Sequence, residues 1–444
     1  MPSLIQRLFT VRTGEFAAAL LAGAYFFCVL SSYYILKPIR EQMGIAHGVD
    51  KLTWLYTGTF VAMLVAQPIY ALLVARSARR RLISVAYRFF ALNLLAFFAL
   101  LQLAPDWHPF GVAASFYVWV SVYNLFIVSV FWSFMADIFS LEQGKRLFGF
   151  ISVGGTLGAI FGAGLTKFLV EIVGTTRLLL ISVVLLEIAV QLMHAIARSR
   201  GITAHEPVAL EPAAPVARIE DRTHGGVFSG VGLVLKSRYL QGICFFMLGY
   251  ALISTFFYYE LSNIVAAAIT SRDERTAFFA NIDLLVNLIA LTVQIFLTGH
   301  VVRRIGIGWT LLILPLLSIG LFVALGLDPV LQVVVVAQVA FRGVYFATAK
   351  PAREMLFTVV GREAKYKSKN LIDTFVHRGG DALGGWIWKG LFDGLHMGLH
   401  QLAFLGAGLA VVWAGVSRWL GKQEQRFERE TPRSPTDESS STAT

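Results

Sequence analysis

Long apolar runs recur along the whole chain, and each is about 20 residues long, the length that a helix needs to cross a lipid bilayer. Hydrophobic residues make up 56% of the 444 residues and charged residues 15%. A soluble domain is nearer half apolar and a quarter charged. The sequence therefore predicts an integral membrane protein, whose helices pack in lipid and not around one water-driven core.

The apolar runs predict twelve membrane-spanning helices, with boundaries good to a few residues. The six spans expected in the first half are 14–36, 52–75, 82–104, 112–138, 148–172 and 176–197. The six expected in the second half are 239–264, 276–301, 308–327, 330–351, 370–392 and 399–420. These spans divide the chain into an N-terminal half (1–198), a linker (199–238), a C-terminal half (239–421) and a tail (422–444).

The linker contains prolines and mixed charges and is expected to be cytoplasmic and flexible at least in part, and the tail is expected to be disordered. Lys and Arg gather in alternate loops, after the second, fourth, sixth, eighth and tenth spans. By the positive-inside rule, both termini are expected in the cytoplasm, with the protein in the cell inner (plasma) membrane. The same loops explain the net charge of +11, so we expect no nucleic-acid partner.

A glycine motif occurs once in each half. Gly154, Gly158 and Gly162 are four residues apart, a small-residue face that lets membrane helices approach closely. Gly380 and Gly384 repeat the spacing, and aligning the two Gly-Gly pairs gives an offset of about half the chain. Since each half has an even number of spans, both halves share one orientation. The predicted fold is an all-α membrane protein with twelve transmembrane helices in two parallel six-helix halves, the major facilitator architecture.

Several ionisable residues lie inside predicted spans, where charge is costly and usually serves a cavity or a partner. Arg342 is near mid-membrane by helix rise, whereas Lys37, Arg40 and Arg88 lie nearer span ends. The alternatives for each are a structural ion pair or a long side chain that reaches the membrane surface. The candidate substrate-binding residues are Lys37, Arg40, Arg88, Glu260, Asp283, Arg342, Arg378 and Asp381.

Further charged residues lie at the cytoplasmic ends of the fourth and tenth spans, and they suit gate ion pairs better than a binding site. These gate candidates are Asp137, Lys145, Arg146, Lys350 and Arg353.

Motifs of zinc peptidases, serine hydrolases and phosphate-binding loops are missing from the sequence. The two cysteines, Cys28 and Cys244, lie in apolar runs and indicate neither a disulfide framework nor a metal site. We expect no catalytic residue and no cofactor.

Four motifs resemble the ATP/ADP translocase family of plastids and intracellular bacteria. They are YYILKPIREQMG (33–44), FWSFMADIFSLEQGKRLF (131–148) with the glycine face after it, KPAREMLF (350–357) and KSKNLIDTFVHRGGDALGG (367–385). The resemblance covers nearly all of the membrane region. It implies a major facilitator fold and solute exchange across a membrane.

The family's functional residues carry over only in part. Its basic first-span positions fall on Lys37 and Arg40, and its basic residue before the second glycine motif falls on Arg378. Its acidic residue of the seventh span falls near Tyr259 or Glu260. The family also has an acidic residue in the fourth span, where this chain reads VWVSVYNLF without a carboxylate.

The predicted function is secondary transport of an organic anion by alternating access, with a nucleotide as the leading substrate class and ATP/ADP-type exchange as the mode. Arg342 and Arg378 are expected to bind phosphate or carboxylate, because guanidinium forks suit those groups. Two other hypotheses stay open: a proton-coupled symporter or efflux carrier for another solute, and a non-transporting membrane scaffold or sensor. The expected partners are a small anionic molecule and the bilayer, with a monomer favoured.

Overall fold

The computed structural model describes residues 15–76, 79–103, 110–199, 231–296, 298–357, 360, 368–369 and 371–430, and the described chain is almost entirely helical. The elements of the first half are α2 (Phe16–Ile45), η1 (Val49–Lys51), α3 (Leu52–Arg76), α4 (Arg79–Leu103), α5 (Phe110–Ile138), α6 (Leu141–Val173) and α7 (Leu178–Ser199). Those of the second half are α9 (Val231–Lys236), α10 (Arg238–Ala268), α11 (Arg272–Phe296), α12 (Thr298–Leu327), α13 (Leu331–Val344), η3 (Tyr345–Ala349), α14 (Lys350–Leu356), η4 (Leu371–Val376), α16 (His377–Lys389), η5 (Gly390–Gly394) and α17 (Leu399–Glu430).

Eleven of the described helices are long and apolar enough to cross a membrane. The predicted eleventh span, 370–392, is not among them because η4, α16 and η5 together carry Asp373, Arg378, Asp381 and Lys389. These three elements nevertheless follow one another without a break. The all-helical fold of two six-helix halves is confirmed, with one span too polar to be recognised by hydropathy.

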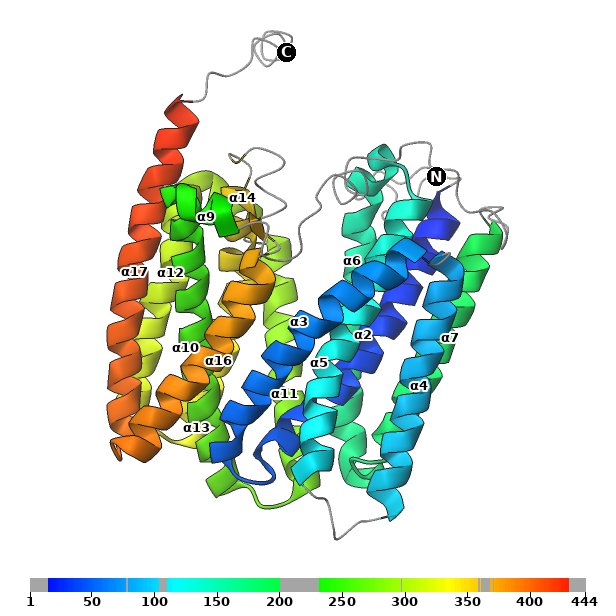
Figure 1. Cartoon of the computed structure of the whole chain (residues 1–444), viewed down its shortest axis with the longest axis horizontal. Coiled ribbons are helices and arrows are strands. Elements are labelled where there is room, and N and C mark those ends of the chain that lie inside the picture. The colour runs from blue at the N-terminus through cyan, green and yellow to red at the C-terminus, as the bar shows by residue number, and fades with distance from the viewer. Residues whose placement is uncertain are drawn as a thin grey trace.

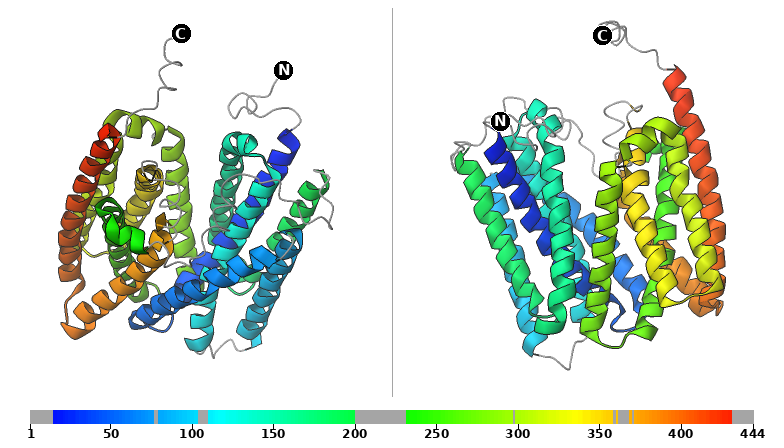
Figure 2. Two further views of the ribbon diagram at one scale, coloured as in Figure 1. Left: turned by 45° about the horizontal axis from the view of Figure 1, so that its top comes forward. Right: turned by 180° about the vertical axis from the view of Figure 1, so that it is seen from behind.

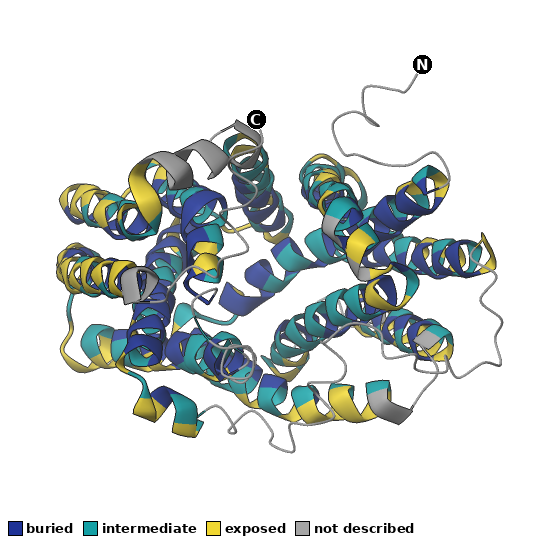
Figure 3. Ribbon diagram, turned by 90° about the horizontal axis from the view of Figure 1, so that it is seen from above, coloured by how far each residue is buried: buried dark blue, intermediate teal, exposed yellow. Residues whose placement is uncertain are grey.

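The helices form two bundles, α2 to α7 and α9 to α17, which lie side by side (Figure 1). Helix α2 begins and α17 ends on the same side of the molecule, which we call the termini side; the opposite side is the far side. The two bundles approach each other at the far side and diverge towards the termini side (Figures 1 and 2). Exposed residues gather on the outer surface of the bundles, and buried residues lie where helices face one another (Figure 3).

The glycine face of α6 brings two helices into backbone contact. A Cβ atom added at Gly154 would lie 2.3 Å from the carbonyl oxygen of Gly23, and one added at Gly158 would lie 2.3 Å from that of Phe27. At Gly162 the corresponding contact is with the carbonyl oxygen of Ser31, at 2.5 Å. Only glycine allows α6 and α2 to pack this closely.

The second glycine face lies on α16 and packs against α10, the counterpart of the α6–α2 pair. Here the contacts are with side chains: an added Cβ would lie 2.8 Å from Ala251 Cβ at Gly380 and 3.1 Å from Thr255 Cβ at Gly384. On α6 both glycines of the pair contact α2, since a Cβ added at Gly155 would lie 2.3 Å from the Phe26 ring. On α16 only the second glycine of the pair contacts α10, and Gly379 faces Phe60 of α3.

Helical structure extends into both the predicted linker and the predicted tail. Helix α9 (Val231–Lys236) lies within the predicted linker, and α17 continues to Glu430, past the predicted start of the tail at 422. The prediction that residues 422–430 are disordered is therefore wrong, because the last helix extends beyond its apolar part. The rest of the linker, 200–230, and of the tail, 431–444, lies outside the described residues.

Candidate functional site

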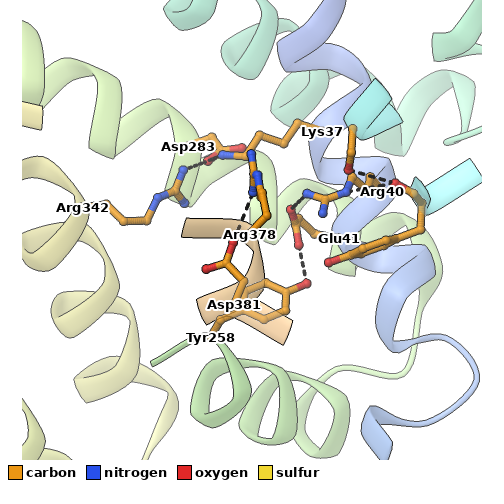
Figure 4. Close-up of polar contacts among 10 residues, drawn as sticks. Lys37, Arg40, Glu41, Tyr258, Asp283, Arg342, Arg378 and Asp381 are labelled. Carbon is orange, nitrogen blue, oxygen red and sulfur yellow. Dashed lines mark hydrogen bonds and ion pairs between the residues drawn. The ribbon is translucent and has the colours of Figure 1, made fainter. Parts of the chain in front are cut away.

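Charged side chains from both halves converge in the space between the bundles (Figure 4). Asp283 on α11 is at their centre, and its side chain is only 2% exposed. Its Oδ1 atom accepts from Lys37 Nζ of α2 at 2.6 Å and from Arg342 Nη2 of α13 at 2.6 Å. The partner of Lys37 thus lies in the other half, so its side chain points into the protein and does not reach the membrane surface.

A second group comes from the polar helix α16. Arg378 Nη1 donates to Asp381 Oδ2 at 3.3 Å, and His377 Nε2 lies 4.0 Å from the same oxygen. The three residues share one face because they are three and four positions apart. Arg378 keeps 34% of its side chain exposed, so its guanidinium group remains accessible beside the Asp283 group (Figure 4).

A third group lies nearer the far side. Arg40 Nη1 donates to Glu41 Oε1 at 2.9 Å, and the Arg40 guanidinium group lies 3.9 Å from the centre of the Tyr117 ring. The hydroxyl of Tyr258 on α10 donates to the other carboxylate oxygen of Glu41, which links the two halves again (Figure 4). Sequence reasoning missed Tyr117, because nothing in the order of residues on α5 indicates that its ring faces α2.

Positive charge exceeds negative charge in this cluster. It contains the four basic side chains of Lys37, Arg40, Arg342 and Arg378, against the three carboxylates of Glu41, Asp283 and Asp381. Arg342 is 23% exposed although it lies in the interior part of its span. We call these seven residues the central cluster. Its excess charge and accessible guanidinium groups suit an anion with planar oxygen pairs.

Two candidates from the sequence lie elsewhere. Arg88 of α4 is 55% exposed and donates to Glu187 of α7 at 3.0 Å on the outer surface of the first half, so its assignment to the binding site is wrong. The two long side chains find each other across neighbouring helices on that surface. Glu260 of α10 is fully buried and belongs to none of the three groups, and neither of its carboxylate oxygens has a hydrogen-bond partner among the described residues.

Three of the five gate candidates contact partners within their own halves. Arg146 Nη2 pairs with Glu15 at 3.0 Å, and Arg353 pairs with Glu354 and with Asp373, each at 2.9 Å. Lys350 Nζ lies over the ring of Phe346. Asp137 is exposed, and the side chain of Lys145 is outside the described part. These residues lie on the termini side, where the two bundles diverge (Figure 1). That they close a gate in the state in which the termini side is shut stays a prediction.

Among the described residues, no group of three or more His, Cys, Asp or Glu side chains is placed to hold a metal ion.

Several aromatic residues lie around the central cluster. Tyr33 and Tyr34 of α2 contact each other edge to face, and Tyr250 of α10 stacks on Tyr345 with ring centres 4.0 Å apart. The half-buried rings of Tyr33 and Tyr34 offer faces for an aromatic or cationic group, whereas Tyr250 and Tyr345 are buried.

Comparison with known proteins agrees with this architecture. A family model described as Major Facilitator Superfamily matches residues 16–363. The chain is 26% identical over 216 residues to ADP,ATP carrier protein 2 of Chlamydia pneumoniae, which covers 43% of this chain and 40% of that protein. It is 24% identical over 351 residues to ADP,ATP carrier protein 2 of Chlamydia trachomatis, covering 69% and 65% respectively. The chain thus spans less than two thirds of the length of either relative.

Solved structures share the fold at low sequence identity. The nucleoside transporter NupG has a TM-score of 0.64 at 13% identity and covers 92% of this chain and 99% of that one. A bacterial homologue of the human lysosomal transporter Spinster, in an inward-facing and unoccupied conformation, has a TM-score of 0.59 at 14% identity, covering 96% and 100%. With a family match over most of its length and two parallel six-helix halves, the chain belongs to the major facilitator superfamily of membrane transporters.

Proposed function

We propose that the protein moves an organic anion across a membrane by alternating access, and that the anion is a nucleotide exchanged for another nucleotide. The observation that carries this proposal is the central cluster, in which four basic side chains from both halves meet three carboxylates between the bundles. An excess of partly exposed Lys and Arg in the interior of a transporter is expected where a negative substrate binds.

Two further observations narrow the substrate class. Relatives that align over much of this chain are named ADP,ATP carriers, although the chain covers only part of their length. The half-buried rings of Tyr33 and Tyr34, next to Lys37, provide surfaces on which a nucleobase can stack. Phosphate and base would then be held by different parts of one site, the phosphate by guanidinium forks and the base by aromatic rings.

The experiment that tests this function is ligand binding followed by exchange. Purified protein is screened by thermal shift against ATP, ADP, adenosine, sugar phosphates and dicarboxylates. We expect the nucleotides to stabilise the protein and adenosine, which lacks phosphate, to stabilise it little, because the basic cluster has no charge to pair with. Vesicles preloaded with ADP should then take up labelled ATP. Stabilisation by dicarboxylates alone would assign the site to another anion, and no response to any anion would refute the proposal.

A second candidate, proton coupling, is favoured by Glu260. Its carboxyl group is fully buried and has no hydrogen-bond partner in the described part of the chain, so it is costly to keep charged and is a place where a carrier can hold a proton. Uptake driven by a pH gradient without internal substrate, and abolished in Glu260→Gln, would favour this mode. Uptake that requires internal substrate and persists in Glu260→Gln would favour exchange.

A further inference from the structure

One carboxylate oxygen serves both halves of the molecule. Asp283 Oδ1 accepts from Lys37 of the first half and from Arg342 of its own half, each at 2.6 Å (Figure 4). The Asp283 side chain is 2% exposed and Lys37 14%. This pair is therefore largely withdrawn from solvent, where the loss of one partner leaves an uncompensated charge.

The position of Lys37 ties this ion pair to closure of the far side. Lys37 lies in the last third of α2, close to where this helix ends at Ile45 on the far side. Helices α2 and α11 pack against each other in the region where the bundles meet. Alternating access requires the far side to open in the opposite state, so α2 and α11 must separate there. Lys37 then loses Asp283, whereas Arg342 keeps it, because α13 and α11 both belong to the second half of the chain.

We propose that Lys37 exchanges partners during transport: it binds Asp283 when the site is empty and the far side is closed, and it binds the anionic group of the cargo when the far side opens. The Asp283 carboxylate then competes with the cargo for Lys37. Because the far side opens readily only when cargo replaces Asp283, this competition makes transport an exchange. This inference rests on the proposed anion transport, since only a negative cargo can replace the carboxylate at Lys37.

The competition explains why an empty carrier would stay closed at the far side. Without cargo, opening takes the Asp283 carboxylate from the Lys37 ammonium group and leaves that group with Glu41, one turn away on α2 and already paired with Arg40, which opposes the change. With cargo, the anion supplies the counter-charge, and Arg378 offers a second basic group in the same cluster. A ligand shifts a conformational equilibrium only by its differential affinity for the two states, and the freed Lys37 provides that difference.

The test compares two uptake rates in reconstituted vesicles, one with internal ADP and one without, using labelled ATP outside. In the wild type, exchange should exceed net uptake by about tenfold or more, because the empty carrier is held closed. In Asp283→Asn, which leaves Lys37 without its internal competitor, net uptake should rise until the two rates agree within about threefold. Glu187→Gln is the matched control, since it neutralises a carboxylate on the outer surface, and it should keep the wild-type ratio.

A second variant avoids leaving a buried cation unpaired, in case Asp283→Asn does not fold. Lys37→Gln keeps the pair of Asp283 and Arg342 intact. Spin labels at Ala46 and Arg272, both exposed on the far side, should show one short distance in the empty wild type and an added longer population in empty Lys37→Gln. An unchanged rate ratio in Asp283→Asn, or an unchanged distance in empty Lys37→Gln, would overturn partner exchange. Absence of any anion binding by the wild type would instead refute the proposed function.

Discussion

The glycine faces of the two halves differ in what they contact. On α6, Gly154 and Gly158 meet the backbone of α2, with carbonyl oxygens 2.3 Å from where a Cβ would be. On α16, Gly380 and Gly384 meet the Cβ atoms of Ala251 and Thr255 on α10, at 2.8 and 3.1 Å. The second half also contains the three described π-helical segments, η3, η4 and η5, two of which flank the charged helix α16.

The difference shows that a repeated sequence motif does not fix a repeated function. The first half uses its glycines to join two helices without intervening side chains, which makes α2 and α6 a tightly fitted pair. In the second half, Arg342 lies three residues before η3 begins and Arg378 two residues after η4 ends. Since π-helical turns occur frequently at functional sites, these positions agree with the proposed role of Arg342 and Arg378 in binding.

The largest expected effect comes from adding one methyl group to the first glycine face. In Gly158→Ala the new Cβ would meet the backbone of Phe27, so α2 and α6 must move apart. We expect loss of most folded protein or a fall in the free energy of unfolding at or above the upper end of the roughly 1–3 kcal/mol typical of overpacking. Size-exclusion profiles and melting temperatures in detergent measure this effect.

The matched change in the second half should be milder. In Gly384→Ala the new Cβ lies 3.1 Å from the Cβ of Thr255, so α16 and α10 need to part by only a few tenths of an ångström. We expect a destabilisation of about 1 kcal/mol or less, read as a small shift in melting temperature. Equal losses of stability in Gly158→Ala and Gly384→Ala would remove the contrast between the two glycine faces.

The smallest effect is expected for the charges on the outer surface. The double variant Arg88→Leu with Glu187→Leu removes an ion pair that lies outside the central cluster. Because distant sites act independently, nucleotide affinity should stay within about twofold of the wild type. A larger loss of affinity, with the folded state intact, would return Arg88 to the binding site and weaken the assignment of that site to the central cluster.

The fold could be predicted from the sequence because bilayer thickness sets the length of each apolar run and the glycine spacing marks helix contacts. Hydropathy failed at the predicted eleventh span, which holds Arg378 and Asp381 and is too polar to be recognised by composition. Arg342 was predicted from its depth in the membrane, and Asp283 from its position as an ionisable residue inside a span. Their pairing, and that of Lys37 with Asp283, depends on how the halves pack, which one chain's residue order does not reveal.

The same limit explains the error at Arg88. Depth in a span does not tell which way a side chain points. From sequence alone, Arg88 and Lys37 are equally plausible binding residues, because both are basic and lie nearer span ends. The structure separates them, because Lys37 faces α11 and Arg88 faces Glu187 on the surface. Tyr117 was missed for the converse reason, since an aromatic residue in an apolar span is ordinarily a packing residue.

Among the basic groups proposed to bind the negative end of the cargo, Arg378 has the most exposed side chain. The most direct test of this role is equilibrium binding of ATP to purified wild type, Arg378→Ala and Arg378→Lys. Losing one charge-assisted hydrogen bond costs roughly 1.5–3 kcal/mol, so Arg378→Ala should weaken binding about ten- to a hundredfold while the protein stays folded. Arg378→Lys should recover part of the affinity, because it restores the charge without the bidentate fork. Equal affinity in all three folded proteins would contradict this role and make Arg378 a structural residue.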